Sequence, residues 1–538
     1  MNTFGSNSPG SPHSTLTGLW NYMCFTLRLN RIRYLVWIAV IVFLLAYVGV
    51  FYKAEFDTQA KLDEFAAIGS APGMVALTGQ ISSMGTLGGA VWTKIWMTLA
   101  MTLAIGMVFQ VTHGARADEE NGRTELFRSK PLGLHSTLVS TIVGSFFLCL
   151  VIGIASAVIC AAIGLDPDGA GITGSVVFGL SVMGCGWLGV GVGALTNQLS
   201  SGASTANSVG SLVILASYAL RLIGDMNNNA LTWISPIGWG EKMAPWGENR
   251  GWLIISFIAL TAILVAAALM IEARRDYGSG ILQEKKGESD ASLLMHHPFG
   301  LTVHLYKKSI IGWLIGIVLT GLMFGSVSQA MVDLLDGMDI PIVSGDGLTA
   351  LAGLLLCFIG LVSLGLPLQI MTGLRSDEAK GLTEAQLAGG LSRARLVLEH
   401  LAVAFASAAA LLLLGGASFG ASYGASVDDP SQIWRLALNA LVYLPGIMAV
   451  TGITVVLFGF APRATIPVTW ALFAGMYFHV LLSDALNLPD WLSDILPFTG
   501  TPRLPYEDFN SSVFGFAAAA IVLIVLGTLG LKKRDVPQ

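Results

Sequence analysis

Two short charged segments of the chain repeat one another. Residues 116–125 read Arg-Ala-Asp-Glu-Glu-Asn-Gly-Arg-Thr-Glu, and residues 375–384 read Arg-Ser-Asp-Glu-Ala-Lys-Gly-Leu-Thr-Glu. Six of the ten positions are identical at an offset of 259 residues. The acids would occupy the first turn of a short helix, where the helix dipole favours negative charge. A loop that is merely kept charged by topology would not need this spacing, so we predict that the segments dock a cytoplasmic partner.

The candidate docking residues are those of the repeated pattern. They are Arg116, Asp118, Glu119, Glu120, Gly122, Arg123 and Glu125 in the first segment, and Arg375, Asp377, Glu378, Gly381 and Glu384 in the second. The alternative is a pair of solvated loops with no partner.

Polar and aromatic side chains recur at helical spacing inside three apolar runs. These candidates for a substrate pathway are Trp96 and Met97, then Ser204, Asn207, Ser208 and Ser211, and finally Trp470, Phe473, Met476 and Tyr477. Hydroxyl groups facing aromatic rings would suit a large amphipathic molecule. Helix packing is the alternative use of the same residues.

Several kinds of chemistry are missing from the sequence. No Gly-Lys dipeptide occurs, so the chain has no phosphate-binding loop of the G-x-x-x-x-G-K-[ST] type. The eight histidines form no H-E-x-x-H motif, and we expect no metal site and no catalytic residue. Almost no carboxylate lies inside an apolar run, which argues against a carrier driven by protons or sodium ions. Lys94 and His479 are the side chains that keep such a carrier possible.

Composition places these residues in a membrane. Of the 538 residues, 54% are hydrophobic and 12% are charged, about half the charge of a soluble protein. Runs of about 20 apolar residues indicate membrane-spanning helices. We predict twelve spans, at 34–52, 90–112, 138–163, 172–195, 203–224, 251–272, 309–328, 348–372, 396–420, 432–460, 464–483 and 511–531.

Lys and Arg set the predicted orientation. With the N-terminus inside the cell, the cytoplasmic segments carry 21 of these residues and the opposite side carries five. This bias predicts that both termini are cytoplasmic and that the chain is a multi-pass protein of the plasma membrane.

The chain divides into two halves of six spans. We predict a cytoplasmic N-terminus at 1–33 with an amphipathic helix on the membrane surface, a first half at 34–272, a cytoplasmic linker at 273–308 and a second half at 309–538. Each repeated segment follows the second span of its half. Six is an even number, so the halves are parallel repeats. The predicted fold class is therefore an all-α polytopic membrane protein with two parallel six-helix repeats.

The first charged segment resembles a family of permeases. The pattern Arg116-x-Asp-Glu-Glu-x-Gly-Arg-x-Glu125, with Ser235-Pro-Ile-Gly-Trp-Gly-Glu-Lys-Met243 and Arg275-Asp-Tyr-Gly-Ser-Gly280, resembles actinobacterial ABC-2-type permeases described as exporters of polyketide antibiotics, the tetronasin-type or multidrug exporters. The second half departs from the family pattern, since Ala379 replaces an acid and Leu382 replaces an Arg.

This resemblance implies a type V exporter-like membrane subunit of an ABC transporter. It implies two copies of a separate ATP-binding cassette protein, which hold ATP and Mg²⁺, dock on the loops after spans 2 and 8, and drive export of hydrophobic or amphipathic compounds such as drugs, polyketide antibiotics or lipids. An ion-coupled multidrug carrier of six plus six spans stays open as the alternative. Its loop after the second span can also carry an Asp and a Gly-Arg pair, as Asp118 and Gly122-Arg123 do here.

Overall fold

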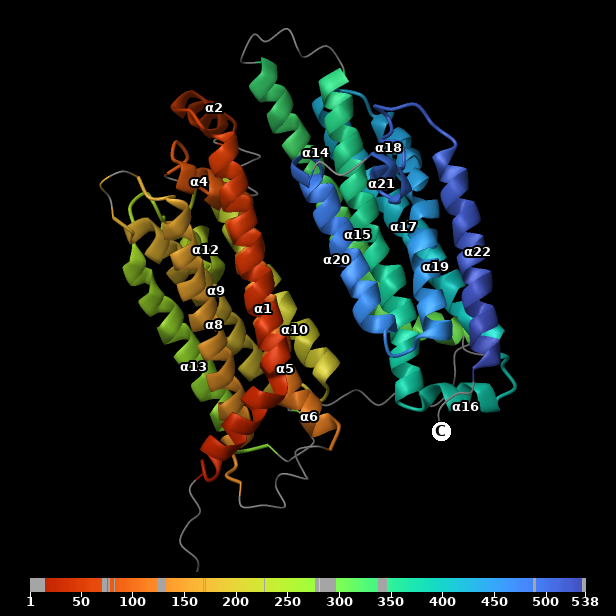
Figure 1. The fold of residues 1–538 in the computed structure, drawn as a ribbon, viewed down its shortest axis with the longest axis horizontal. Helices are drawn as coiled ribbons and strands as arrows, with labels where there is room; N and C mark the ends of the chain where they lie inside the picture. The colour runs from red at the N-terminus through yellow and green to blue at the C-terminus, as the bar shows by residue number, and fades with distance from the viewer. Residues whose placement is uncertain are drawn as a thin grey trace, which may run out of the picture. The chain divides into compact units, whose positions relative to one another are not determined.

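The helices are grouped in two units, residues 1–286 and 287–538, in a computed structural model of the chain. The structure describes residues 15–69, 75, 78–81, 83–122, 132–167, 169, 171–226, 228–275, 280, 297–336, 346–486 and 490–534. Within these ranges the chain is helical, with turns between the helices and no extended sheet. The long helices of each unit run side by side (Figure 1).

The first unit contains six long helical segments joined by short ones. In chain order it holds α1 (Leu19–Glu55), α2 (Gln59–Gly69), α4 (Leu87–Val91), the π-helical turn η1 (Trp92–Trp96), α5 (Met97–Gly114), α6 (Arg116–Glu120), α8 (Ser136–Ile163), α9 (Thr173–Leu199), α10 (Ala203–Met226), α11 (Leu231–Ile234), α12 (Pro236–Lys242), the 3₁₀ turn η2 (Gly251–Leu253) and α13 (Ile254–Glu272). Figure 1 shows α6 at the end of this unit where α1 begins, and α2 at the opposite end.

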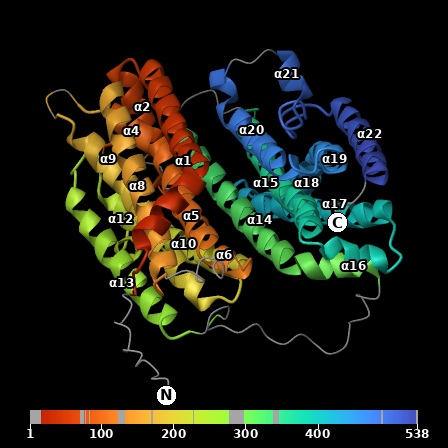
Figure 2. The same ribbon diagram turned by 60° about the horizontal axis from the view of Figure 1, so that its bottom comes forward.

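The second unit has a similar series. It holds α14 (Pro298–Asp336), α15 (Asp346–Ala379), α16 (Leu382–Ala388), α17 (Arg393–Ser426), α18 (Gln432–Ala440), the 3₁₀ turn η4 (Leu441–Tyr443), α19 (Leu444–Phe460), α20 (Thr465–Leu486), α21 (Asp490–Ile495) and α22 (Ser512–Lys533). Figure 2 shows α16 lying across the end of this bundle, at an angle to α15.

Eleven helical segments of the described chain are long and apolar enough to cross a membrane. They coincide with eleven of the twelve predicted spans. The remaining prediction, 464–483, falls on α20, which has 22 residues but is not among the eleven. The described chain therefore establishes a polytopic helical membrane protein, and the count of twelve stays a prediction, as do the parallel arrangement of the halves and the side on which the termini lie.

The first helix of each unit begins earlier than its predicted span. Residues 19–33 are helical as expected but continue without interruption into the span, so α1 is one helix of 37 residues. Likewise α14 begins at Pro298, inside the segment 273–308 that was expected to be a linker. Helical hydrogen bonding can continue beyond the apolar run because flanking polar residues do not interrupt it. Hydropathy therefore locates each span but not the end of its helix.

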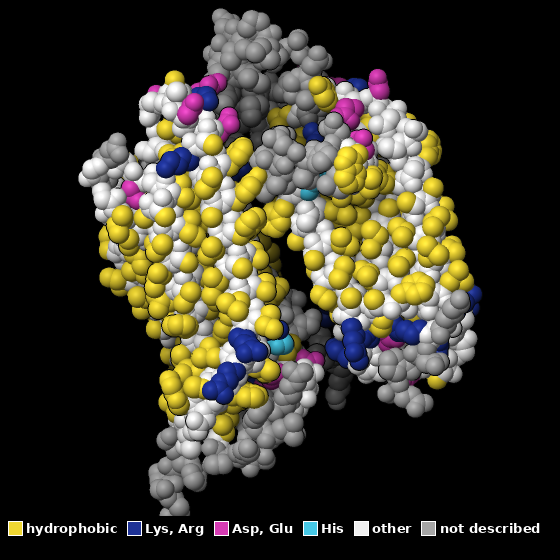
Figure 3. Space-filling view, in the orientation of Figure 1, with side chains coloured by type: hydrophobic (Ala, Val, Ile, Leu, Met, Phe, Trp, Pro, Cys, Tyr) yellow, Lys and Arg dark blue, Asp and Glu magenta, His cyan; other side chains and the backbone are white. Residues whose placement is uncertain are grey.

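Helix α9 forms the centre of the first unit, packed against α5, α8 and α13. Its glycines permit this close packing. A Cβ atom at Gly189 would lie 2.1 Å from the carbonyl oxygen of Ala104 on α5, and one at Gly179 would lie 2.3 Å from that of Gly153 on α8. Within each unit, hydrophobic side chains cover the middle of the face seen in Figure 3, and Lys and Arg gather below this band.

Candidate functional site

The first repeated segment forms α6 and an ion-paired cluster inside the first unit. Arg116 is 2% exposed. Its guanidinium Nη1 lies 3.1 Å from Glu119 Oε2, and its Nε donates to the carbonyl oxygen of Ser201 at 3.1 Å. Arg275, just beyond α13, reaches the same carboxylate, with Nη1 3.0 Å from Oε1 and Nη2 2.6 Å from Oε2. The cluster therefore ties α6 to the segment after α13 and to the turn before α10.

The second repeated segment forms the same cluster in its own unit. Arg375 Nη1 lies 3.0 Å from Glu378 Oε2, and Arg375 Nε donates to the carbonyl oxygen of Pro462 at 2.8 Å. Arg534, just beyond α22, is ion-paired with Glu378 and donates from Nη1 to the carbonyl oxygen of Phe458 at 2.7 Å. We call each Arg–Glu–Arg set a clamp: Arg116, Glu119 and Arg275 in the first unit, and Arg375, Glu378 and Arg534 in the second.

The second Arg of each clamp was not among the predicted site residues, although Arg275 begins one of the family patterns. Arg275 and Arg534 are separated by 534 − 275 = 259 residues, the same offset that relates the two charged segments. The signal was therefore present as a third matching position. Each of these arginines lies 156 positions along the chain from the glutamate that it binds, so the ion pair is not visible in the local sequence.

The clamps change what the predicted docking residues can offer to a partner. Four of them, Arg116, Glu119, Arg375 and Glu378, direct their charge into contacts within a unit. Glu120 is exposed, although it accepts a hydrogen bond from the backbone N–H of Ala203 at 3.1 Å. The other described candidates, partly or fully exposed, are Asp118, Gly122, Asp377, Gly381 and Glu384. Arg123 and Glu125 lie outside the described residues. A docking surface would thus use the outer acids and not the clamp.

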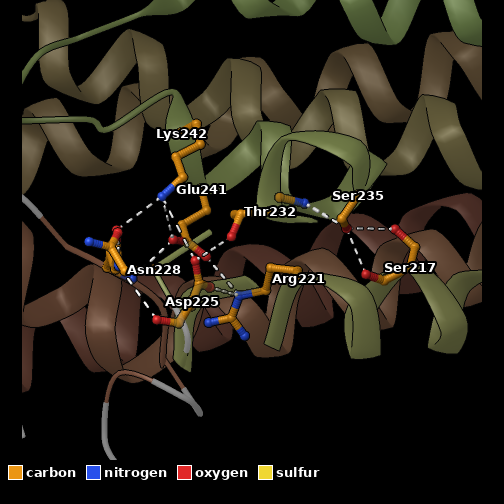
Figure 4. A network of polar contacts seen from close by, with 10 residues as sticks. Ser217, Arg221, Asp225, Asn228, Thr232, Ser235, Glu241 and Lys242 are labelled. Carbon is orange, nitrogen blue, oxygen red and sulfur yellow. Dashed lines mark hydrogen bonds and ion pairs between the residues drawn. The ribbon is translucent and has the colours of Figure 1, made fainter. Parts of the chain in front are cut away.

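A second charged cluster lies at the opposite end of the first unit. Figure 4 shows Arg221 and Asp225 of α10 beside Glu241 and Lys242 of α12. Arg221 Nε lies 2.8 Å from Asp225 Oδ2 and 2.7 Å from Glu241 Oε2, and all three side chains are buried. Lys242 Nζ is 3.8 Å from Asp225 and 3.7 Å from Glu241. The carboxylates balance the cations, as burial of charge requires.

The sequence of the 235–243 segment explains why α12 returns to α10. Ser235 caps α12 by accepting a hydrogen bond from Gly238 N at 3.2 Å, and Pro236 suits the first turn of a helix. A Cβ atom at Gly238 would lie 2.1 Å from the carbonyl oxygen of Thr232, and one at Gly240 would lie 2.8 Å from the Trp96 ring. The glycines therefore let α12 approach close enough for Glu241 to reach Arg221.

Burial governs the proton affinity of Glu241. Desolvation and the neighbouring Asp225 carboxylate raise its pKa to about 7, although the positive charge of Arg221 opposes the shift. Two carboxylates beside one buried guanidinium retain a proton more readily than an isolated pair would. The cluster also borders a cavity of about 560 Å³, lined in part by Gln80, Trp233 and Arg250. The charge network of this motif was not predicted from the sequence, because Glu241 and Arg221 meet only once α12 packs against α10.

Among the candidate pathway residues of the first unit, Trp96 is the most deeply buried. It has no exposed surface, its ring stacks on Trp92 with centroids 4.3 Å apart, and its Nε1 donates to Ser181 Oγ at 2.9 Å. It therefore belongs to the core. Met97 is partly exposed, Ser204 and Ser208 are exposed, and Asn207 and Ser211 are half-buried.

The aromatic candidates of α20 divide in the same way. Met476 is buried in the apolar core of the second unit, against which Phe473 and Tyr477 also pack. Trp470 is 39% exposed and lies edge-on to Phe473, with ring centroids 5.7 Å apart. The part of these residues in a substrate pathway stays a prediction. His479 is buried, and neither ring nitrogen has a hydrogen-bond partner among the described residues. Lys94 is exposed on η1.

Comparison with known proteins supplies the family. Residues 19–248 match the ABC-2 type transporter family, and residues 295–532 match the C-terminal domain of the multidrug efflux system permease Rv1217c. The chain is 31% identical over 542 residues to the multidrug efflux system permease protein Rv1217c of Mycobacterium tuberculosis, covering 98% of this chain and 97% of that protein. The chain therefore belongs to the ABC-2-type permeases of multidrug efflux systems, multi-pass proteins of the plasma membrane.

Proposed function

We propose that the chain is the membrane subunit of an ATP-driven exporter that moves hydrophobic or amphipathic compounds out of the cell. Two copies of a separate cassette protein would bind ATP and Mg²⁺ and would dock at the ends of the units that carry the clamps. The observation that carries this proposal is the pair of clamps, which hold α6 in the first unit and the last turn of α15 in the second, each at the end of the second span, through the same Arg–Glu–Arg contacts. Two matched rigid elements suit two copies of one partner.

The clamp gives docking a mechanical consequence. A partner that displaces α6 would also displace the segment after α13, because Glu119 is joined to Arg275 by two charge-assisted hydrogen bonds. The same holds for the end of α15 and the segment after α22 through Glu378 and Arg534. Movement at a docking loop would therefore reach both the second and the last span of a unit.

Transport in proteoliposomes tests this function against the ion-coupled carrier. The full chain is reconstituted alone and with its cassette partner, and accumulation of a fluorescent hydrophobic dye is followed. Transport should require the partner and ATP, should continue when a protonophore collapses the proton gradient, and should be absent with the chain alone. Transport that needs no ATP and stops with the protonophore would overturn the proposal and support the ion-coupled carrier.

A further inference from the structure

A pocket of about 380 Å³ lies in the first unit beside the middle of α1, between α1, the last turns of α5 and the start of α10. Its walls combine one cation, aromatic rings and small polar groups. The lining residues are Arg33, Trp37, Gly106, Phe109, Gln110, Thr112, His113, Ala117, Ala203 and Asn207. In the predicted orientation this is the cytoplasmic leaflet of the membrane.

The apolar wall is built by close contact of Trp37 with Gly106. A Cβ atom at Gly106 would lie 2.1 Å from the Trp37 ring, so only glycine at this position lets the ring pack directly against the α5 backbone. Phe109, one turn further along α5, is 47% exposed and continues the aromatic surface. Rings at this position give a hydrophobic body or acyl chain a contact surface.

The polar wall contains oxygen atoms with unused hydrogen-bonding capacity. Thr112 is 1% exposed and its Oγ1 has no hydrogen-bond partner among the described residues. Asn207, on the facing helix α10, is half-buried, and its Oδ1 also has no hydrogen-bond partner among the described residues. Leaving such groups buried and unpaired costs free energy, so they call for an explanation. Both oxygens are closed to solvent, so a polar headgroup would satisfy them only after the two side chains turn toward the pocket.

We propose that this pocket binds an anionic amphiphile, with a carboxylate or phosphate headgroup beside Arg33 and an apolar body against Trp37 and Phe109. Arg33 supplies charge and donors, the Thr112 hydroxyl is a further donor, and the Asn207 amide donates when its oxygen and nitrogen exchange places. Asp118 attracts the Arg33 guanidinium electrostatically, so a bound anion competes with it. The pocket includes Asn207 of the candidate substrate pathway, so this inference deepens the proposed function and rests on it, while its binding test needs neither ATP nor a cassette partner.

Quenching of Trp37 fluorescence by a spin-labelled fatty acid tests the site in the full chain in detergent. The probe is doxyl-stearate, compared with its uncharged methyl ester, and Trp37→Phe identifies the signal from the pocket. We expect saturable quenching by the acid and at least about tenfold weaker binding of the ester or of the Arg33→Gln variant, because a charge-assisted contact is lost. Asp118→Asn should tighten binding of the acid by removing the competing charge.

The matched control is Arg31→Gln, an exposed cation on the same helix that does not line the pocket. It should change the affinity by less than about twofold. Equal binding of acid and ester, or equal loss in the Arg31 and Arg33 variants, would overturn the proposal. Competition with phosphatidylglycerol then distinguishes the sources: displacement of the probe assigns the site to a bilayer lipid, and no displacement assigns it to a carboxylate-bearing solute.

Discussion

At the scale of single residues, Arg221 is the side chain on which the charge balance of the first unit depends most. It is fully buried and contacts Asp225 and Glu241, so its removal leaves two carboxylates facing one partly exposed lysine. Loss of one partner of a buried ion pair costs about 3–5 kcal/mol. Arg221→Ala should therefore lower the free energy of unfolding by about that amount, measured by chemical denaturation in detergent.

Lys61→Ala is the control for this prediction. Lys61 pairs with Asp57 at 2.9 Å, but both side chains are exposed, so water replaces the lost partner. It should leave the unfolding transition nearly unchanged. If both variants unfold like the unaltered protein, the Arg221 cluster does not stabilise the unit.

Glu241 gives the unit a pH dependence of a definite sign. Its pKa is raised from 4.5 to about 7, chiefly by burial. Between these values the folded protein holds a proton that the unfolded chain has lost, so stability falls as the pH rises through this window. We expect a loss of no more than about 3 kcal/mol from about pH 5 to about pH 8.

Thermal denaturation across this pH range tests the assignment. Glu241→Gln should reduce the loss of stability with rising pH, because the neutral amide does not titrate. Glu248→Gln, at a 55% exposed carboxylate paired with Arg250, should keep it. An unchanged slope in the Glu241 variant would assign the pH dependence to another group.

At the scale of elements, each clamp should behave as one energetic unit. Glu119 and Arg275 share two hydrogen bonds and are both largely buried. In a double-mutant cycle, the losses of unfolding free energy in Glu119→Gln and in Arg275→Gln should therefore add up to more than the loss in the double variant, by about 0.5–3 kcal/mol. Arg274→Gln, an exposed neighbour, is the control and should add independently of Glu119→Gln. Additivity for the Arg275 pair would mean that the clamp is not energetically coupled.

The elements also show how far the sequence alone predicts this protein. Hydropathy located eleven long apolar helices of the described chain, though not the ends of those helices, because a bilayer demands about 20 apolar residues wherever a helix crosses it. The roles of the charges were harder to predict. Glu119 looked like a docking residue because its partner Arg275 is distant in sequence, and Glu241 could be paired with Arg221 only once α12 was seen to pack against α10. Burial of Trp96 likewise depends on contacts from α9 and α12.

At the scale of the whole molecule, the proposed function expects two separate docking events for one chain, one at the clamp of each unit. Two exposed acids of the repeated segments, Glu120 at the end of α6 and Glu384 in the first turn of α16, offer charge to a partner without contributing a clamp carboxylate. Charge reversal there should therefore weaken docking and leave the unit folded. The buried Glu119 and Glu378 would give an ambiguous result, since their reversal breaks the clamp itself.

Titration of the cassette protein onto the chain in nanodiscs, followed by native mass spectrometry, measures both events. Glu120→Lys should weaken one of the two by about tenfold, because it replaces attraction with repulsion, and Glu384→Lys should weaken the other. The double variant should weaken both, while Glu64→Lys, the same change on α2 at the opposite end of the first unit, should weaken neither. Binding of a single cassette protein, or binding of two with affinities that none of these charge reversals changes, would contradict docking at these acids. The clamps would then brace the ends of the two bundles without any partner.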